Sequence, residues 1–441
     1  MTFTTLNASQ LINKKRAQIA VLSEELFQLE KEQFMTDATI DAQTKKQMLD
    51  DLTTAQQFVL TVNELRTHHL GYPGNFKQNS PLYHHFRQLE AELPLLNNIG
   101  DIFDEGNARL HSKKWERDIL NLFAEKFGLT DNWWGYLTSG GSESNDWAIN
   151  QGRSLLPDSI FYHSTGAHYS ITKSSTNFMS EAIPTCGPDD ERINVDLLTQ
   201  RIQENYERLG LAANIVLTWG TTKYGAIDDV WAVKKFLIAH HIPHYLHLDA
   251  AHFGGIPNNQ IGAPIIDDIR SLGVHSISVS LHKYIGLPQV KGVLLSVEEP
   301  ATQNAVDYIG QKDTTSCGSR DLLPFSTKQQ VLEMLKLSDP NDYQRNIRYF
   351  EARLNERKIP FIRYAYSNTF VIAEPSSEIC SHYQLSQFKN DTGHKKAHVI
   401  IFPYQSQAQL LALANDLAND SKAQSDMTLN FKQRVLQTNE S

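Results

Sequence analysis

The chain has 441 residues, a formal net charge of −9 and a hydrophobic content of 40%. This length is enough for a substantial core in two or three structural units, and the negative charge argues against nucleic acid or an anionic membrane as a partner. The three cysteines lie far apart without metal-site spacing, and neither a secretory signal nor a membrane-spanning run is evident, so we expect a reduced, cytoplasmic protein without a metal.

Residues 8–67 are rich in Gln, Glu, Lys, Leu and Ala with helical spacing, for example at Leu22, Leu26 and Leu29. This pattern predicts a helical N-terminal extension over residues 1–67 that carries no catalytic group. The extension has two interpretations, an arm that clasps a partner subunit or a loosely attached amphipathic appendage.

Predicted strands and helices alternate over residues 68–300, which favours one large α/β domain with a mostly parallel sheet. Each predicted strand is an apolar or β-branched run that ends in small and polar residues. Functional groups of such sheets collect just beyond the carboxyl ends of the strands. Five segments of this form predict a site at one sheet edge: 134–143, 160–168, 215–222, 245–252 and 276–283.

The residues at these strand ends have complementary chemistry. Gly141 and Ser142 lie in a glycine turn before a predicted helix, where backbone N–H groups bind phosphate. Asp249 ends an apolar strand and would keep a pyridine nitrogen protonated, while Lys283 offers an amine whose pKa is lowered by burial. Considered alone, Ser142 is equally consistent with a helix N-cap, Asp249 with a loop carboxylate and Lys283 with a surface lysine. Together with His168, whose flat ring can stack on a cofactor, they indicate pyridoxal 5′-phosphate.

The order of glycine turn, histidine, threonine pair, aspartate and lysine resembles the pyridoxal-phosphate-dependent group II amino acid decarboxylases, and more narrowly their histidine and serine decarboxylase branch. The resemblance spans roughly residues 70–415. Asp249-Ala250-Ala251 and His282-Lys283 mark the wider group, and Gly220-Thr221-Thr222 with Gly225-Ala226-Ile227-Asp228-Asp229 marks the narrower branch.

The resemblance implies a role for each matching residue. Lys283 would hold the cofactor as a Schiff base, Asp249 would pair with the ring nitrogen, and His168 and Ala251 would pack on opposite ring faces. Thr222 would lie near the ring hydroxyl or the phosphate. The remaining phosphate contacts would come from Gly141, Ser142, Ser280 and His282. The implied reaction converts an L-amino acid into its amine and CO2.

The resemblance also implies the aspartate aminotransferase fold, known as fold type I. In this α/β fold, a large cofactor-binding domain over residues 68–300 holds a mostly parallel seven-stranded sheet. A small α+β C-terminal domain over residues 301–425 follows, including an active-site loop at its start. Residues 426–441 are polar, and we expect a mobile tail there.

Residues 307–320 are polar and follow the last predicted sheet strand, 292–297. One interpretation is a mobile loop that excludes water and delivers a proton donor, with Tyr308 helping reprotonation. In family members a comparable segment completes the partner's site, so we expect a homodimer with active sites at the subunit interface. The alternative is an ordinary surface connection.

The substrate is the least determined feature. Serine-acting relatives carry a tyrosine after the residue that matches Asn107, but this chain has Ala108 and Arg109, which predicts a roomier, more basic pocket. Tyr72 is expected to contact the substrate side chain. We expect L-histidine, converted to histamine, ahead of serine. Arg109 would also suit an acidic substrate, and another fold type I lyase remains an alternative.

Overall fold

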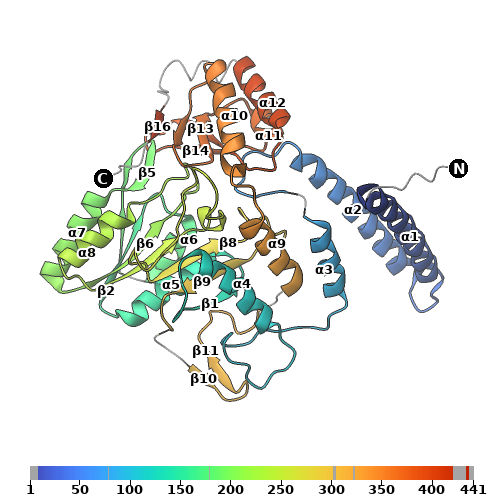
Figure 1. Ribbon diagram of the computed structural model, residues 1–441, viewed down its shortest axis with the longest axis horizontal. Helices are drawn as coiled ribbons and strands as arrows, with labels where there is room; N and C mark the ends of the chain where they lie inside the picture. The colour runs from blue at the N-terminus through green and yellow to red at the C-terminus, as the bar shows by residue number, and fades with distance from the viewer. Residues whose placement is uncertain are drawn as a thin grey trace. The chain divides into compact units, whose positions relative to one another are not determined.

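The computed structural model describes residues 8–77, 79–177, 179–300, 304–320, 323–420 and 434–436. The chain divides into two compact units, Met1–Thr67 and His68–Ser441. Figure 1 shows its elements in chain order. Among the described residues, no helix combines the length and the apolar character that crossing a bilayer requires.

The first unit is a pair of helices, α1 (Ala8–Thr36) and α2 (Ala42–Arg66). Asp41 caps α2, because its carboxylate accepts hydrogen bonds from the backbone N–H groups of Gln43 and Thr44, both at 2.9 Å. The apolar side chains that the structure describes on both helices, including Leu22, are largely exposed, and α2 has no buried residue. The unit is therefore helical, as its sequence pattern predicts, and it presents apolar surface.

The second unit is built around a seven-stranded sheet in which six strands run parallel and β9 runs antiparallel to both neighbours. This arrangement confirms the predicted fold class. Every residue of the four strands β1, β6, β8 and β9 is buried, as expected for a sheet covered on both faces. In spatial order the strands are β1 (Trp134–Thr138), β9 (Gly292–Ser296), β8 (Ser276–Ser280), β7 (His244–Asp249), β6 (Ala212–Thr218), β2 (Ser159–Ser164) and β3 (Ser180–Ile183).

Helices connect the parallel strands. Helix α5 (Gly141–Leu155) packs against β7, β8 and β9, and α7 (Val195–Leu209) lies beside α8 (Val230–Ala239) (Figure 1). Asn194 caps α7 and Gly210, at a φ of 68°, ends it, so local signals set both boundaries. The remaining helical and hairpin elements of this region are α3 (Pro81–Ala91), α4 (Lys113–Lys126), α6 (Tyr169–Ser174), η1 (Ser175–Asn177), β4 (Thr185–Gly187), β5 (Asp190–Ile193) and η2 (Phe253–Gly255).

A second, five-stranded sheet with flanking helices forms the C-terminal region. Its strand order is β14 (Ser386–Lys389), β15 (Lys395–Ile400), β13 (Thr369–Ala373), β12 (Ile362–Tyr364) and β16 (Arg434–Leu436). The helices are α10 (Asp342–Glu356), α11 (Ser377–His382) and α12 (Gln407–Asn419), while the hairpin β10 (Asn304–Val306) and β11 (Gln311–Asp313) and helix α9 (Pro324–Lys336) precede them.

Strand β16 lies within the segment that is expected to be a mobile tail. Most of residues 426–441 lie outside the described residues, but Arg434–Leu436 pair in parallel with β12. Leu436 also packs beside the cluster that contains Tyr224 and Tyr364. The edge of β12 thus provides hydrogen-bond partners for these three residues that composition does not reveal, and the mobile tail stays a prediction.

Candidate active site

A cavity of about 250 Å³ opens at the carboxyl edge of the large sheet. It contains all nine residues predicted to bind the cofactor, together with Tyr72. The lining residues follow the ends of β1, β2, β6, β7 and β8, which run parallel and therefore end at one edge. They are Tyr72, Ser139, Gly140, Gly141, Ser142, Glu143, Asn145, His168, Tyr169, Thr218, Gly220, Thr222, Asp249, Ala251, Ser280, His282, Lys283 and Val290.

Lys283 and Asp249 enter this cavity from the ends of neighbouring strands. The backbone of Lys283 is fixed by hydrogen bonds to Ser280 (3.3 Å) and Asn75 (2.9 Å). Burial lowers the pKa of the Lys283 amine, and the nearby Asp249 carboxylate acts in the opposite direction. A lowered pKa makes more of the amine neutral and nucleophilic near pH 7.

The turn between β1 and α5 is shaped for an anion. A Cβ added to Gly141 would lie 2.7 Å from Ser280 Oγ, so only glycine fits this close approach. Within the described part of the chain, no side chain caps α5. The structure therefore does not support the alternative in which Ser142 is an N-cap, and the first N–H groups of α5 remain available to a phosphate.

Three further polar side chains lie at the cavity. His168 Nδ1 accepts a hydrogen bond from the backbone N–H of Ser170 (3.3 Å), which leaves the proton on Nε2, and burial lowers the pKa of His168. Buried His282 Nδ1 and Thr218 Oγ1 have no hydrogen-bond partner among the described residues. The cavity therefore offers the groups that pyridoxal phosphate requires, namely an amine, a carboxylate, a glycine turn and unpaired polar atoms.

Three predicted residues lie elsewhere. Tyr308 is 85% exposed, Arg109 is exposed, and neither they nor Ala108 line the cavity of their own chain. Asn107 N–H donates to Ile309 O at 2.9 Å, so the segments that carry these residues lie side by side. Their predicted roles stay predictions.

Asn145, Glu143 and Thr218 also line the cavity, although none of them was predicted as a site residue. Asn145 lies one helical turn after Gly141, so the 3.6-residue period places both on the same face of α5. Glu143 accepts hydrogen bonds from Ser139 N–H (2.8 Å) and Tyr136 O–H (3.0 Å). This carboxylate therefore fixes the glycine turn to β1.

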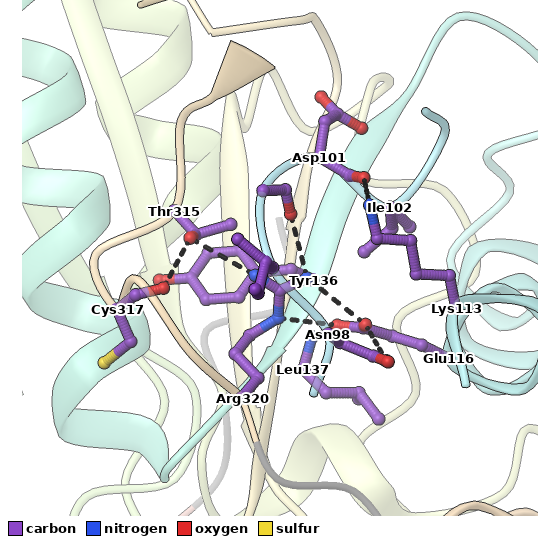
Figure 2. Close-up of polar contacts among 12 residues, drawn as sticks. Asn98, Asp101, Ile102, Lys113, Glu116, Tyr136, Leu137, Thr315, Cys317 and Arg320 are labelled. Carbon is purple, nitrogen blue, oxygen red and sulfur yellow. Dashed lines mark hydrogen bonds and ion pairs between the residues drawn. The ribbon is translucent and has the colours of Figure 1, made fainter. Parts of the chain in front are cut away.

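A buried ion pair anchors the segment that follows β11 (Figure 2). Arg320 Nε lies 3.2 Å from Glu116 Oε1, and both side chains are almost fully buried. Glu116 also accepts from Leu137 N–H (2.9 Å) and Asn98 Nδ2 (2.7 Å). Trp147 Nε1 donates to Thr314 O at 2.7 Å. Residues 314 and 320 are thus held by side chains of α5 and α4, while the mobility predicted for 307–320 stays a prediction.

Replacing Glu116 by glutamine is expected to lower the free energy of unfolding by about 3–5 kcal/mol, since Arg320 would remain buried without a counter-charge. Urea unfolding followed by circular dichroism measures this change. Asp118→Asn on the same helix is the matched control, because the Asp118–Lys328 pair (2.7 Å) is about 30% exposed on each side. Its loss should cost less than about 1 kcal/mol. Equal losses in both variants would contradict this account of the anchor.

The fold is shared with a protein of known structure. The structure resembles the L-methionine decarboxylase from Streptomyces sp.590 with a TM-score of 0.71 and 20% identity, covering 87% of this chain and 96% of that one. This likeness shows that the chain has the fold type I architecture.

Sequence comparisons narrow the class. Residues 148–350 match the pyridoxal-dependent decarboxylase conserved domain. The chain is 31% identical over 378 residues to serine decarboxylase 2 of Oryza sativa subsp. japonica, covering 83% of this chain and 77% of the rice protein. It is also 31% identical over 366 residues to a histidine decarboxylase of Pseudomonas entomophila (strain L48), covering 79% and 85%. The chain belongs to the group II pyridoxal-phosphate-dependent amino acid decarboxylases, in the histidine and serine decarboxylase branch.

Proposed function

We propose that this decarboxylase acts on L-histidine and releases histamine and CO2. The observation that carries the proposal is the single cavity that holds Lys283, Asp249 and the glycine turn together with Tyr72. Histidine decarboxylases of Pseudomonas entomophila, Vibrio campbellii and Solanum lycopersicum are 29–31% identical to the chain and support this substrate. Serine is the second candidate, supported by the rice serine decarboxylases. A cytoplasmic location remains a prediction.

The geometry supports a division of roles within the site. Lys283 would hold pyridoxal phosphate through its amine, and Asp249 would keep the ring nitrogen protonated. Gly141, Ser142, Ser280 and His282 would bind the phosphate, with Thr222 near the phosphate or ring hydroxyl, and His168 and Ala251 would cover the two ring faces. When bound, the cofactor's ring accepts the electron pair that is left as the substrate carboxylate departs as CO2.

His168 and Lys283 have different proposed roles, ring stacking for His168 and proton transfer for Lys283. The hydrogen bonds to Ser170 fix the imidazole of His168 in its neutral form, so that it presents a flat ring without adding a positive charge beside Lys283. Lys283 would hold the cofactor, and as a buried amine with a lowered pKa it would also be suited to take up or return a proton in the cavity.

A panel of the common L-amino acids tests the substrate. The purified protein, reconstituted with pyridoxal phosphate, is incubated with each amino acid, and CO2 and amine are measured. We expect L-histidine to give the highest kcat/KM and equimolar CO2 and histamine. Release of CO2 from serine or an acidic amino acid, with none from histidine, would overturn the proposed substrate while leaving the decarboxylase class intact.

We also propose that two chains form a homodimer whose active sites include residues from both. The exposed Tyr308 and Arg109 support this proposal, because they lie outside the cavity of their own chain. The exposed apolar side chains of α1 and α2 fit an arm that clasps the partner. Tyr308 would then assist reprotonation in the partner's site, where Ala108 and Arg109 would contact the substrate.

Subunit mixing tests this arrangement. Lys283→Ala and Tyr308→Ala proteins, each expected to be impaired alone, are unfolded together and refolded. If the two residues come from different chains, each mixed dimer has one intact site, and random re-association of a two-fold dimer restores about one quarter of the wild-type activity. No recovery in a mixture that size-exclusion chromatography shows to be dimeric would place both residues in one chain.

A further inference from the structure

A row of buried polar side chains extends from Asp249 into the interior, away from the cavity edge. Asn145 Nδ2 donates to Asp249 Oδ2 at 2.9 Å, and Asn145 Oδ1 lies 3.0 Å from His247 Nε2. His247 Nδ1 lies 2.8 Å from Ser276 Oγ, which accepts from the Tyr245 O–H at 2.8 Å. All five side chains are at most 4% exposed, so water does not compete for these hydrogen bonds.

Strands β7 and β8 explain why these side chains line up. Tyr245, His247 and Asp249 alternate along β7 and therefore face one side of the sheet. His247 is in register with Ser276 on β8, and Asp249 is in register with Ser278. Ser278 Oγ also donates to Asn145 Oδ1, at 2.6 Å. The members on β7 and β8 are thus held by backbone pairing as well as by their side-chain contacts.

The charge on Asp249 fixes the direction of every hydrogen bond in the row. An ionised carboxylate only accepts, so Asn145 must present its amide nitrogen and turn its oxygen toward His247. His247 must then carry its proton on Nε2 and accept at Nδ1 from the Ser276 hydroxyl. Ser276 in turn accepts from Tyr245. Each donor therefore points toward Asp249, whose carboxylate is the acceptor at the end of the aligned chain.

The neutral state of His247 fits this arrangement. Burial lowers the pKa of His247 to about 4, despite the opposing effect of Asp249, so one ring nitrogen is a donor and the other an acceptor at neutral pH. Burial of five polar side chains is costly unless each is paired. All five side chains are paired only when the hydrogen bonds run in this one direction. The row therefore fixes the position of the Asp249 carboxylate at its end.

We propose that His247 is a positioning residue, which holds Asn145 and through it orients the Asp249 carboxylate that faces the cofactor. The inference rests on the proposed placement of Asp249 beside the ring nitrogen of pyridoxal phosphate. His247 is not among the residues that line the cavity. It acts on the cofactor only through Asn145 and Asp249.

Affinity for the cofactor tests the role without relying on turnover. The full-length protein is freed of cofactor and titrated with pyridoxal 5′-phosphate, followed by absorbance. His247→Leu lacks the Nε2–H donor and is expected to raise the Kd and lower kcat by about 10-fold or more, with KM for the substrate changed less than about 2-fold. His247→Gln can place an amide N–H near the position of Nε2 and is expected to stay within about 3-fold of wild type.

His275→Leu is the matched control. His275 stacks on Tyr245 with ring centroids 5.1 Å apart and accepts from Leu246 N–H, without joining the row to Asp249. Wild-type Kd is expected for this variant. Equal impairment of His247→Leu and His247→Gln, or wild-type affinity and kcat in both, would overturn the proposal.

The proton position on His247 gives a second readout that needs no disruptive variant. In ¹⁵N-histidine-labelled wild-type holoenzyme, the resonances lost in His247→Gln identify His247, and their shifts report which nitrogen carries the proton. A proton on Nε2 supports the proposal, and a proton on Nδ1 overturns it even if His247→Leu does not fold. A wild-type protein that bound no pyridoxal phosphate would instead contradict the proposed function itself.

Discussion

Replacing Lys283 by alanine is expected to reduce decarboxylation by on the order of 10³-fold or more, because no other group could hold the cofactor covalently. Lys283 is the lysine that lines the cavity beside Asp249, and burial lowers the pKa of its amine. The measurement is the rate of CO2 release at saturating substrate and cofactor. Lys235→Ala, at an exposed position on α8, is the control and should keep wild-type activity. Retention of activity in Lys283→Ala would contradict the assigned role.

Lys283→Ala is also expected to change how the free energy of unfolding depends on pH. Because the pKa of Lys283 is lowered from 10.5 in the folded protein, the unfolded chain binds more protons over the pH range just below 10.5. The free energy of unfolding of the cofactor-free protein therefore rises with pH in that range. Part of this rise should be lost in Lys283→Ala, as measured by urea unfolding at several pH values. An unchanged pH dependence would indicate that the amine is not desolvated.

Replacing Asp249 by asparagine is expected to lower kcat by about 10²–10³-fold, the size of effect seen when one preorganised electrostatic partner is removed. A neutral amide cannot hold a proton on the pyridine nitrogen, so the ring would accept electrons less readily. The new amide would also face the Asn145 Nδ2 donor, which lies 2.9 Å from Asp249 Oδ2.

Steady-state kinetics and cofactor titration measure this effect. Asp196→Asn, at an exposed position in the first turn of α7, serves as the control and should behave as wild type. Wild-type kcat in Asp249→Asn would contradict the placement of this carboxylate beside the ring nitrogen. A raised Kd with normal kcat at saturating cofactor would assign it to binding alone.

The sequence predicted the sheet and the cavity because both depend on local patterns. Buried parallel strands appear as apolar runs, and their ends carry small and polar residues that the fold brings to one edge. That rule alone places Lys283, Asp249 and the Gly141 turn in a single cavity. The family resemblance adds the reaction, which no pattern of strands specifies.

Features that depend on distant partners were not predictable. Glu116 and Arg320 are 204 residues apart, and neither has a local signature of burial as a pair. Strand β3 carries exposed and half-buried residues at an edge, so it lacks the apolar run that marks the central strands. His247 is an exception, since alternation along β7 places it on the same face as Asp249, and this signal could have indicated the buried row.

Borohydride reduction of the reconstituted protein tests the central claim most directly. The wild-type protein should absorb in the visible range, lose that band on reduction, and yield a peptide with a pyridoxyl phosphate group on Lys283, as determined by mass spectrometry. A protein that stays colourless after reconstitution, or a label on a lysine other than Lys283, would contradict the account.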